Sequence, residues 1–168
     1  MTASSVYVLD TNVFIEAARR YYAYDIAPAF WQALTEYASS GRVLSIDRVK
    51  AELDRGKDEL AEWADGQFHQ WFASTNDPDV LDAYRQIMIW SQSQSQFTDE
   101  AKAEFARADN ADAWVVAYAK AKSYVVVTHE KFDPNVRRKI PLSNVCKAFS
   151  VSDVDTFQML RALGVKFG

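Results

Sequence analysis

Four acidic side chains lie beside apolar segments of the sequence, at Asp10, Glu52, Asp112 and Glu130. Carboxylates that share a small cleft repel one another and lose hydration, so they need a cation to stay ionised there. A hard divalent ion, Mg²⁺ or Mn²⁺, suits this need because it prefers oxygen ligands and binds through one or two carboxylates and several waters. Such a cluster can activate water and stabilise the leaving oxygen of a phosphodiester. The acids therefore predict metal-assisted hydrolysis, provided that the fold brings them together.

Few other residues offer a different hydrolytic chemistry. Cys146 is the only cysteine, which excludes an internal disulfide and a site with several thiolate ligands. The two histidines, His69 and His129, lie far apart and show no metal-binding spacing. Zinc chemistry is therefore not expected, and the acids remain the main chemical resource of the chain.

The elements that carry these acids alternate between strands and helices. Short apolar runs rich in β-branched residues predict buried strands at residues 6–9, 43–46, 124–128 and 139–140. Periodicity and capping residues predict helices over residues 12–22, 26–39, 48–55, 58–72, 78–91, from 98, and over 109–122, 143–149 and 153–163. This alternation predicts a three-layer α/β/α sandwich with a short, mainly parallel central sheet, in a single domain over residues 1–168.

The direction of the strands in such a sheet predicts where two of the acids lie. Ligands of open α/β sheets bind beyond the carboxyl ends of the parallel strands. Asp10 follows the strand at residues 6–9, and Glu130 follows the strand at residues 124–128. If these strands are neighbours, both carboxylates face the same crevice.

The other two acids, and Asp109 near them, also have structural interpretations. Asp112 lies near a helix N-terminus, which stabilises an anion. Glu52 could pair with Arg48 or Lys50 on its own helix rather than enter a cleft. Asp109 is interpreted as the N-cap of the helix that contains Asp112, in preference to a second acid on the same helix face.

The net charge of −4 is unevenly distributed along the chain. Residues 50–112 carry six basic and fourteen acidic groups, whereas residues 113–168 carry nine basic and four acidic groups. A polyanion such as RNA would be repelled by the first segment and attracted by the second. The densest basic cluster, Arg137-Arg138-Lys139, is therefore either a phosphate contact or an ordinary solvated loop.

Four segments occur in the order and approximate spacing of the PIN-domain family, which the sequence resembles over nearly its whole length: VYVLDTNVFIEA, RVKAEL, ADAWVVAYA and YVVVTHEKF. PIN domains are metal-dependent ribonucleases, and many are toxins of toxin–antitoxin pairs. The closing segments KIPLSNVCKAF and MLRALGVKF, together with VVVTHE, resemble a PIN-like subgroup known as DUF4411, a domain of unknown function.

The resemblance implies that Asp10, Glu52 and Asp112 bind the metal and that Glu130 completes the catalytic set. At this fourth position the sequence departs from the family, because Thr128-His129-Glu130 stands where Thr-x-Asp is usual. Glutamate keeps the charge on a longer arm, so Glu130 is expected to act as a ligand or as a base outside the ligand set.

Residues around the acids are given supporting roles. The side chains expected to hold a carboxylate or a water in place are Asn12, Thr11 and Thr128. The side chains expected near the mouth of the cleft, as candidates for contact with RNA, are His129, Lys131, Arg137, Arg138 and Lys139. For His129, an ordinary loop position is an equally good interpretation.

The resemblance as a whole implies an endoribonuclease that uses Mg²⁺ or Mn²⁺ to hydrolyse RNA, acting as a toxin with a cognate antitoxin protein. A binding module with a weakened site is an alternative function. A homodimer is considered as an assembly of the protein. A phosphatase-like hydrolase with Asp10 as nucleophile is a weaker alternative, because Asn12 stands where that class has a second aspartate. The N-terminus lacks a signal-peptide pattern and no apolar run would span a bilayer, so a cytoplasmic location is expected.

Overall fold

The computed structural model describes residues 4–167, in which five parallel strands form one sheet of order β3-β2-β1-β4-β5. The strands are β1 (Tyr7–Leu9), β2 (Val43–Ile46), β3 (Phe72–Ala73), β4 (Val125–Val127) and β5 (Asp153–Val154). β1 lies at the centre of the sheet, between β2 and β4. All of its residues are buried, as expected for a strand covered by helices on both faces.

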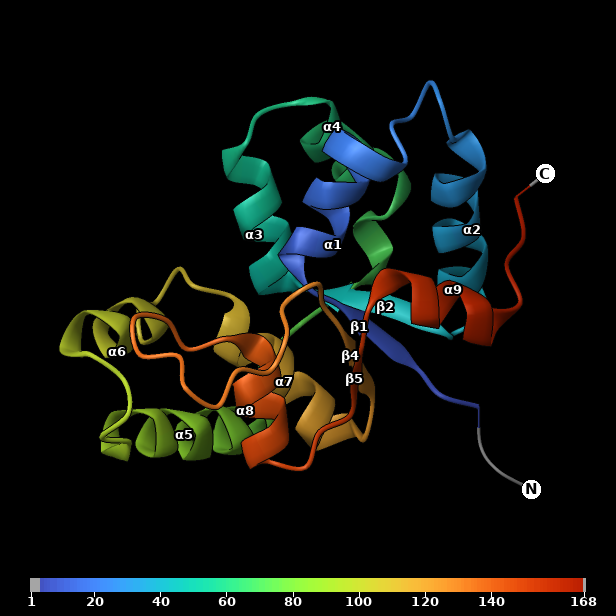
Figure 1. The fold of residues 1–168 in the computed structure, drawn as a ribbon. Helices are drawn as coiled ribbons and strands as arrows, with labels where there is room; N and C mark the ends of the chain where they lie inside the picture. Colours follow the sequence, from blue (N-terminus) through green and yellow to red (C-terminus); the bar gives the residue numbers. More distant parts are fainter. Residues whose placement is uncertain (1–3, 168) are drawn as a thin grey trace.

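Helices connect the strands and cover both faces of the sheet (Figure 1). They are α1 (Thr11–Glu16), α2 (Pro28–Ser39), α3 (Asp47–Arg55), α4 (Glu59–Gln67), α5 (Pro78–Ser93), α6 (Asp99–Phe105), α7 (Asp112–Lys122), α8 (Leu142–Ala148) and α9 (Thr156–Leu163), with a π-helical turn η1 (Ala17–Tyr21) and a 3₁₀ turn η2 (His69–Trp71). One face carries α1, α2, α4 and α9, and the other carries α5, α7 and α8. The predicted three-layer α/β/α sandwich is confirmed.

The core has one part on each face of the sheet. α7 is buried throughout residues 113–119 because it lies between the sheet and α5, which explains its almost wholly apolar sequence. On the opposite face, aromatic rings from α1, α2 and α4 pack together. The ring centroids of Phe14 and Phe68 are 5.7 Å apart, and those of Trp31 and Trp63 are 4.7 Å apart.

The structure differs from the predicted elements mainly at short segments. Residues 139–140 form no strand, and Ile140 is instead a buried side chain that anchors an irregular loop. The predicted helix over residues 58–72 ends at Gln67, and η2 then leads into β3. β3 and β5 are each two residues long, which is too short to produce a periodic pattern in the sequence.

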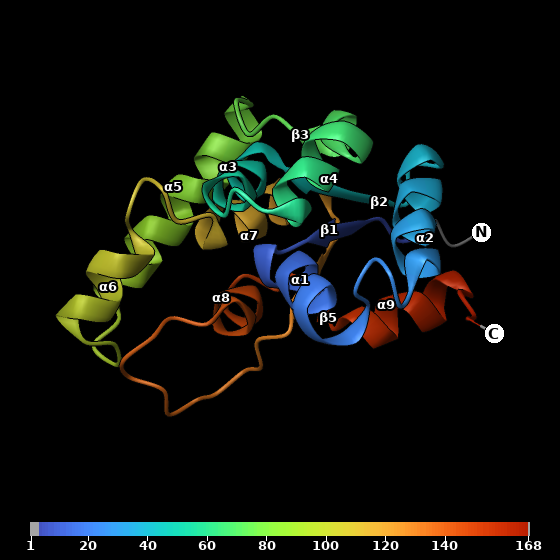
Figure 2. The same cartoon turned by 90° about the horizontal axis from the view of Figure 1, so that it is seen from above.

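One end of the molecule is built by α6 and by the loop between β4 and α8 (Figure 2). The two segments are joined by a hydrogen bond from the Thr98 backbone N–H to the Arg137 carbonyl (2.9 Å). The basic segment of the sequence is thereby brought beside the acidic one.

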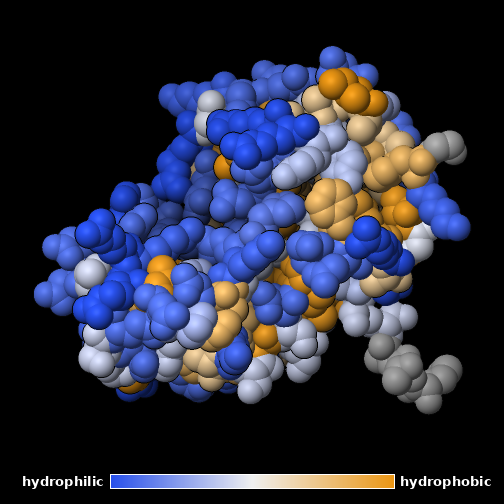
Figure 3. All heavy atoms as spheres, viewed as in Figure 1, coloured by the Kyte–Doolittle hydropathy of each residue, from blue (hydrophilic) through white to orange (hydrophobic). Residues whose placement is uncertain are grey.

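The face seen in Figure 1 is largely hydrophilic, and hydrophobic side chains gather toward its upper right, over α2 and α9 (Figure 3). The exposed large apolar side chains include Tyr21 of η1 and Phe157 of α9, whose ring centroids are 5.8 Å apart. Between residues 4 and 167, no helix has the length and apolar character needed to cross a membrane.

Candidate active site

Asp10 and Thr128 meet because β1 and β4 are neighbours in the sheet. The backbone N–H of Asp10 donates to the carbonyl of Val127 (3.0 Å), which extends the ladder past the strand ends. The Thr128 hydroxyl donates to Asp10 Oδ2 at 3.0 Å. Only 1% of Asp10 and 2% of Thr128 is exposed. The carboxyl end of the sheet thus holds a buried aspartate beside a hydroxyl donor.

Glu52 and Asp112 come together where α3 meets the start of α7. Glu52 Oε1 accepts a hydrogen bond of 2.7 Å from the backbone N–H of Ala111, the residue before α7. The basic neighbours of Glu52 on α3 are engaged elsewhere, because Lys50 pairs with acids of α3 and α4 and Arg48 lies over an aromatic ring of α7. The Glu52 carboxylate is therefore directed to α7 rather than into an ion pair on its own helix.

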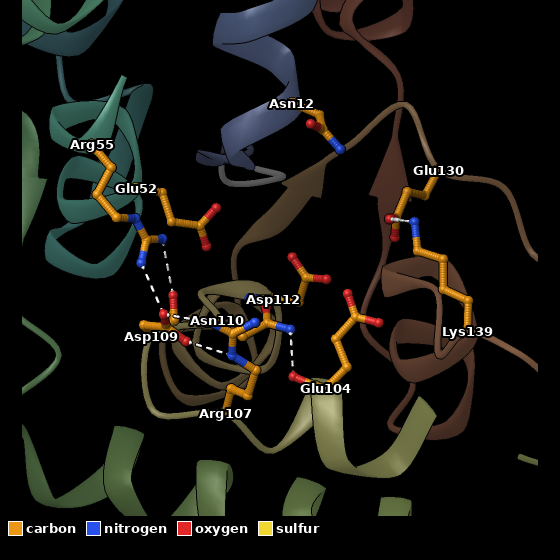
Figure 4. A pocket seen from close by; sticks show the side chains of 10 residues that line it. All are labelled: Asn12, Glu52, Arg55, Glu104, Arg107, Asp109, Asn110, Asp112, Glu130 and Lys139. Atoms are coloured by element: carbon orange, nitrogen blue, oxygen red, sulfur yellow. Dashed lines mark hydrogen bonds and ion pairs between the residues drawn. The ribbon is translucent and has the colours of Figure 1, made fainter. Parts of the chain in front are cut away.

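A polar pocket of about 490 Å³ opens between these elements (Figure 4). Glu52 and Glu130 approach it from opposite sides, with Asp112 between them. The residues that line the pocket are Asn12, Glu52, Arg55, Glu104, Arg107, Asp109, Asn110, Asp112, Glu130 and Lys139.

The acids influence one another's protonation. Burial raises the pKa of Asp10 well above its usual range, and the negative charges of Asp112 and Glu130 raise it further, whereas the hydrogen bond from Thr128 lowers it. Burial also raises the pKa of Asp112 to about 7, with the charges of Glu130 and Glu52 acting in the same direction. The site therefore concentrates negative charge that either protons or a cation must offset.

Glu130, at the position where the sequence departs from the PIN pattern, is bound to groups of the protein itself. Its Oε1 atom forms an ion pair with the Lys139 ammonium, and its Oε2 atom accepts a hydrogen bond of 2.5 Å from the backbone N–H of Leu142. Burial lowers the pKa of Lys139, but the bond to Glu130 and the neighbouring carboxylates raise it by more, so the net shift is upward. Lys139 thus brings a positive charge to the pocket.

Four residues that line the pocket were not predicted as site residues from the sequence: Arg55, Glu104, Arg107 and Asn110. Glu104 extends from α6 into the pocket, where its charge contributes to the raised pKa of Asp112. The side-chain oxygen of Asn110 accepts a hydrogen bond of 2.9 Å from the backbone N–H of Asp112. Glu104 belongs to a short charged helix in which nothing local distinguishes it from other acids, so only the tertiary fold identifies it.

The interpretation of Asp109 as the N-cap of α7 is wrong. α7 begins at Asp112, and Ala111 occupies the N-cap position. The Asp109 carboxylate instead accepts hydrogen bonds from Arg107 (2.8 Å) and Arg55 (3.1 Å). The hydrogen bond from Arg107, more than any other influence, lowers the pKa of Asp109, so this acid stays ionised and holds two cations at the rim of the pocket.

The polar residues that follow the two central strands occupy different surroundings. Asn12 lines the pocket, whereas the Thr11 hydroxyl is buried and has no hydrogen-bond partner within the described part of the chain. His129 Nε2 lies 2.9 Å from the Thr156 hydroxyl, and the histidine ring stacks on Tyr21 with centroids 6.3 Å apart. His129 therefore binds protein groups on the side of the sheet that carries α9.

The basic residues considered for contact with RNA are also dispersed. Lys139 lines the acidic pocket. Lys131 lines a separate cavity of about 320 Å³ beside β5, and Glu130 lines both cavities. Arg137 and Arg138 are exposed on the loop before α8. A phosphate bound in the acidic pocket would thus have Lys139 as its neighbour from this group.

The donor atoms of the pocket suit a hard divalent cation. Glu52 and Asp112, which line the pocket, and Asp10, which is buried and does not line it, offer carboxylate oxygens. The raised pKa values of the two aspartates indicate that positive charge would be favourable there. Within residues 4–167, no group of three or more Asp, Glu, His or Cys side chains is arranged to hold one ion directly. Mg²⁺ does not require such a cage, because it commonly keeps several waters and uses one or two carboxylates.

Replacing Thr128 with valine tests whether the Thr128 hydroxyl stabilises the buried Asp10 carboxylate. Valine preserves the shape of the side chain but removes the hydroxyl that donates to the buried carboxylate. We expect the free energy of unfolding of the metal-free protein to fall by about 1–3 kcal/mol, as measured by urea denaturation at pH 8. Thr128→Ser keeps the hydroxyl donor, so its free energy of unfolding should fall by less. Equal losses of stability in the two variants would show that the hydroxyl does not stabilise Asp10.

The parallel sheet and the three layers give the chain a PIN-like α/β fold, with the acidic pocket at the carboxyl ends of the strands. The chain belongs to the family described as Domain of unknown function (DUF4411), whose sequence profile matches residues 7–167. No curated protein matches the chain significantly.

Solved structures have the same fold. FitAcB from Neisseria gonorrhoeae is 21% identical to the chain, with a TM-score of 0.54 and a match over 88% of this chain and 96% of that one. VapBC2 from Rickettsia felis, bound to a DNA fragment from its promoter, is 15% identical, with a TM-score of 0.51 and coverage of 89% and 98%. FitAB bound to the IR36 DNA fragment is 20% identical, with a TM-score of 0.54 and coverage of 89% and 94%.

Proposed function

We propose that the protein is a divalent-metal-dependent endoribonuclease whose active site is the acidic pocket. The observation that carries this proposal is the position of Glu52 and Asp112 in one polar pocket, with the buried Asp10 near enough for the charge of Asp112 to raise its pKa. Burial and repulsion between carboxylates raise the pKa of both aspartates. Perturbed acids in a cleft are a common property of catalytic sites. A solvated acidic face would instead leave each carboxylate close to its usual pKa.

Asp10, Glu52 and Asp112 would hold Mg²⁺ or Mn²⁺, with one or two of them as direct ligands and the rest acting through the waters of the ion. When bound, such an ion supplies Lewis-acid stabilisation of phosphate charge and makes a coordinated water more acidic at neutral pH. The protein's own part is to orient these groups. Thr128 fixes one oxygen of Asp10, and Ala111 fixes one oxygen of Glu52 through its backbone N–H. Rigid orientation of this kind lowers the reorganisation needed during the reaction.

Cations at the rim of the pocket would bind the RNA backbone. Arg55 and Arg107 are held by Asp109, which leaves further guanidinium N–H groups available to phosphate oxygens. Substrate phosphates would therefore be attracted by the rim and brought toward the acids. The alternative of a phosphatase with Asp10 as nucleophile is less well supported, because Asn12 stands where that class has a second aspartate.

A toxin–antitoxin role extends this proposal. Support comes from the resemblance of the sequence motifs to PIN-domain toxins and from the likeness in fold to FitAB and VapBC2. The cognate partner would be an antitoxin protein that covers the pocket. Co-expression with the adjacent small reading frame tests this part, since the two products should purify together.

The nuclease proposal is tested by calorimetric titration of the metal-free protein with Mn²⁺ and by incubation with labelled single-stranded RNA. We expect the protein to bind Mn²⁺ and to cleave RNA only in the presence of Mn²⁺ or Mg²⁺. Cleavage should stop when EDTA is added and should leave 5′-phosphate ends. Protein that binds neither ion and leaves RNA intact would instead be a non-catalytic binding module, the second function considered.

A further inference from the structure

Both carboxylate oxygens of Glu130 have partners within the protein, as do those of Asp109 at the rim, whereas Glu52 accepts a hydrogen bond at Oε1 from Ala111. One oxygen of Glu130 pairs with Lys139, and the other accepts the backbone N–H of Leu142 at the start of α8. The Glu130 carbonyl also lies 2.7 Å from the Ser143 hydroxyl, and only 11% of the glutamate side chain is exposed. A metal ion bound to Glu130 would share the carboxylate with the Lys139 ammonium and the Leu142 N–H, which already use one acceptor site on each oxygen.

Lys139 is held in position by its own side chain and by the loop that precedes it. The loop before it is fastened to the connection between α5 and α6, where Gln96 Nε2 donates to the Val136 carbonyl (2.7 Å) and the Thr98 N–H donates to the Arg137 carbonyl (2.9 Å). Its side chain is 56% exposed, so solvent and ligands can reach the ammonium. One of the three N–H groups of the ammonium serves Glu130, which leaves two for another anion.

The cations that line the pocket flank the central acid. Arg55 and Arg107 lie with Asp109 on one side of Asp112, and Lys139 lies on the other, beside Glu130 (Figure 4). A nucleic acid strand that crosses the pocket would meet positive charge on both sides of the acids. This arrangement offsets the repulsion between a phosphodiester and the carboxylates it must approach.

We propose that Glu130 is a positioning residue that holds the Lys139 ammonium at the edge of the pocket, where Lys139 binds a phosphate of the RNA substrate, and that Glu130 does not ligate the metal. The inference rests on the proposed ribonuclease function and deepens it. The longer side chain of glutamate, compared with the aspartate usual in PIN domains, allows it to reach Lys139 and the N-terminus of α8 together.

Titration with Mn²⁺ separates a positioning residue from a ligand. Glu130→Gln keeps an acceptor for Leu142 but loses the ion pair, and we expect its Mn²⁺ affinity to fall by less than about tenfold, whereas Asp10→Asn should lose more than about a hundredfold. Equal losses in the two variants would make Glu130 a ligand and overturn the inference while leaving the nuclease proposal intact. Absence of Mn²⁺ binding in the unmodified protein would refute the nuclease proposal itself.

The phosphate contact is tested by RNA affinity in EDTA, measured by fluorescence polarisation over a series of salt concentrations. Lys139→Gln should weaken binding on the order of three- to tenfold and reduce the slope of log affinity against log salt by about 0.7. Lys139→Arg should retain the slope because it retains the charge. Lys166→Gln, which replaces an exposed lysine beside a different cavity, is the matched control and should not change the slope. A slope unchanged in Lys139→Gln would overturn the contact, whether or not the protein binds metal.

The link between the two residues is tested by combining the substitutions. With saturating Mn²⁺, Glu130→Gln should slow RNA cleavage between about ten- and a hundredfold, because Lys139 is no longer held in place. In the Lys139→Gln background the same change should have little further effect. Effects that multiply in the double variant would show that Glu130 acts independently of Lys139 and would overturn the positioning role.

Discussion

Asp10→Asn is expected to reduce metal-dependent RNA cleavage by at least about a thousandfold, since a site that cannot bind its ion loses several kcal/mol of transition-state stabilisation. Asparagine has nearly the same shape as aspartate and keeps an oxygen that can accept the Thr128 hydroxyl. The circular dichroism spectrum should therefore be unchanged. Cleavage is measured with labelled RNA at saturating Mn²⁺.

The same substitution should make the metal-free protein more stable at pH 8, which distinguishes a catalytic loss from a folding defect. Asp10 is 1% exposed, and burial together with two neighbouring carboxylates raises its pKa, so its ionised form destabilises the folded state. Asp25→Asn, at an exposed position between η1 and α2, is the matched control and should change neither property. Retained cleavage in Asp10→Asn, or a large loss in Asp25→Asn, would refute the assigned site.

The central strands could be predicted because their signal is local. Residues 43–46 and the core of 124–128 are short apolar runs bounded by polar residues, and they became β2 and β4. Asp10 could be connected with Thr128 because parallel strands that are neighbours end at the same edge of a sheet. The edge strands β3 and β5 are two residues long and depend on pairing with partners that lie far away in sequence.

The outer parts of the pocket could not be predicted, because they depend on the paths of loops. Aspartate is a residue type typical of N-caps, but in the structure the Asn110 side chain accepts the backbone N–H of Asp112 in the first turn of α7. The Asp109 carboxylate instead binds Arg55 and Arg107. The ion pair between Glu130 and Lys139 joins residues nine positions apart through an irregular loop with no periodic pattern. Glu104 reaches the pocket only because α6 is placed beside α7 by the fold.

The metal-free protein is expected to lose stability as the pH rises from about 4 to about 7, in contrast to proteins stabilised by ionised carboxylates. The pKa of Asp112 is about 7 in the folded protein and close to the ordinary 3.8 when the chain unfolds. Between these pH values the folded state keeps a proton on Asp112 that the unfolded state releases. The contribution of this proton to the free energy of unfolding is therefore complete below pH 4 and is lost as the pH rises through 7. The loss should be on the order of 2–4 kcal/mol by urea denaturation.

Asp112→Asn should flatten this dependence, because an amide has no proton to lose in this range. Asp77 and Asp109 have lowered pKa values, so the stability that their ionised forms contribute is lost only at more acidic pH and does not mask the effect of Asp112. Mn²⁺ at a hundred times its dissociation constant should restore about 2.7 kcal/mol at pH 8, because it binds the folded state alone. The acids of the pocket would then cost the protein stability until the ion binds, and a stability that rises from pH 4 to pH 7 without metal would contradict this account.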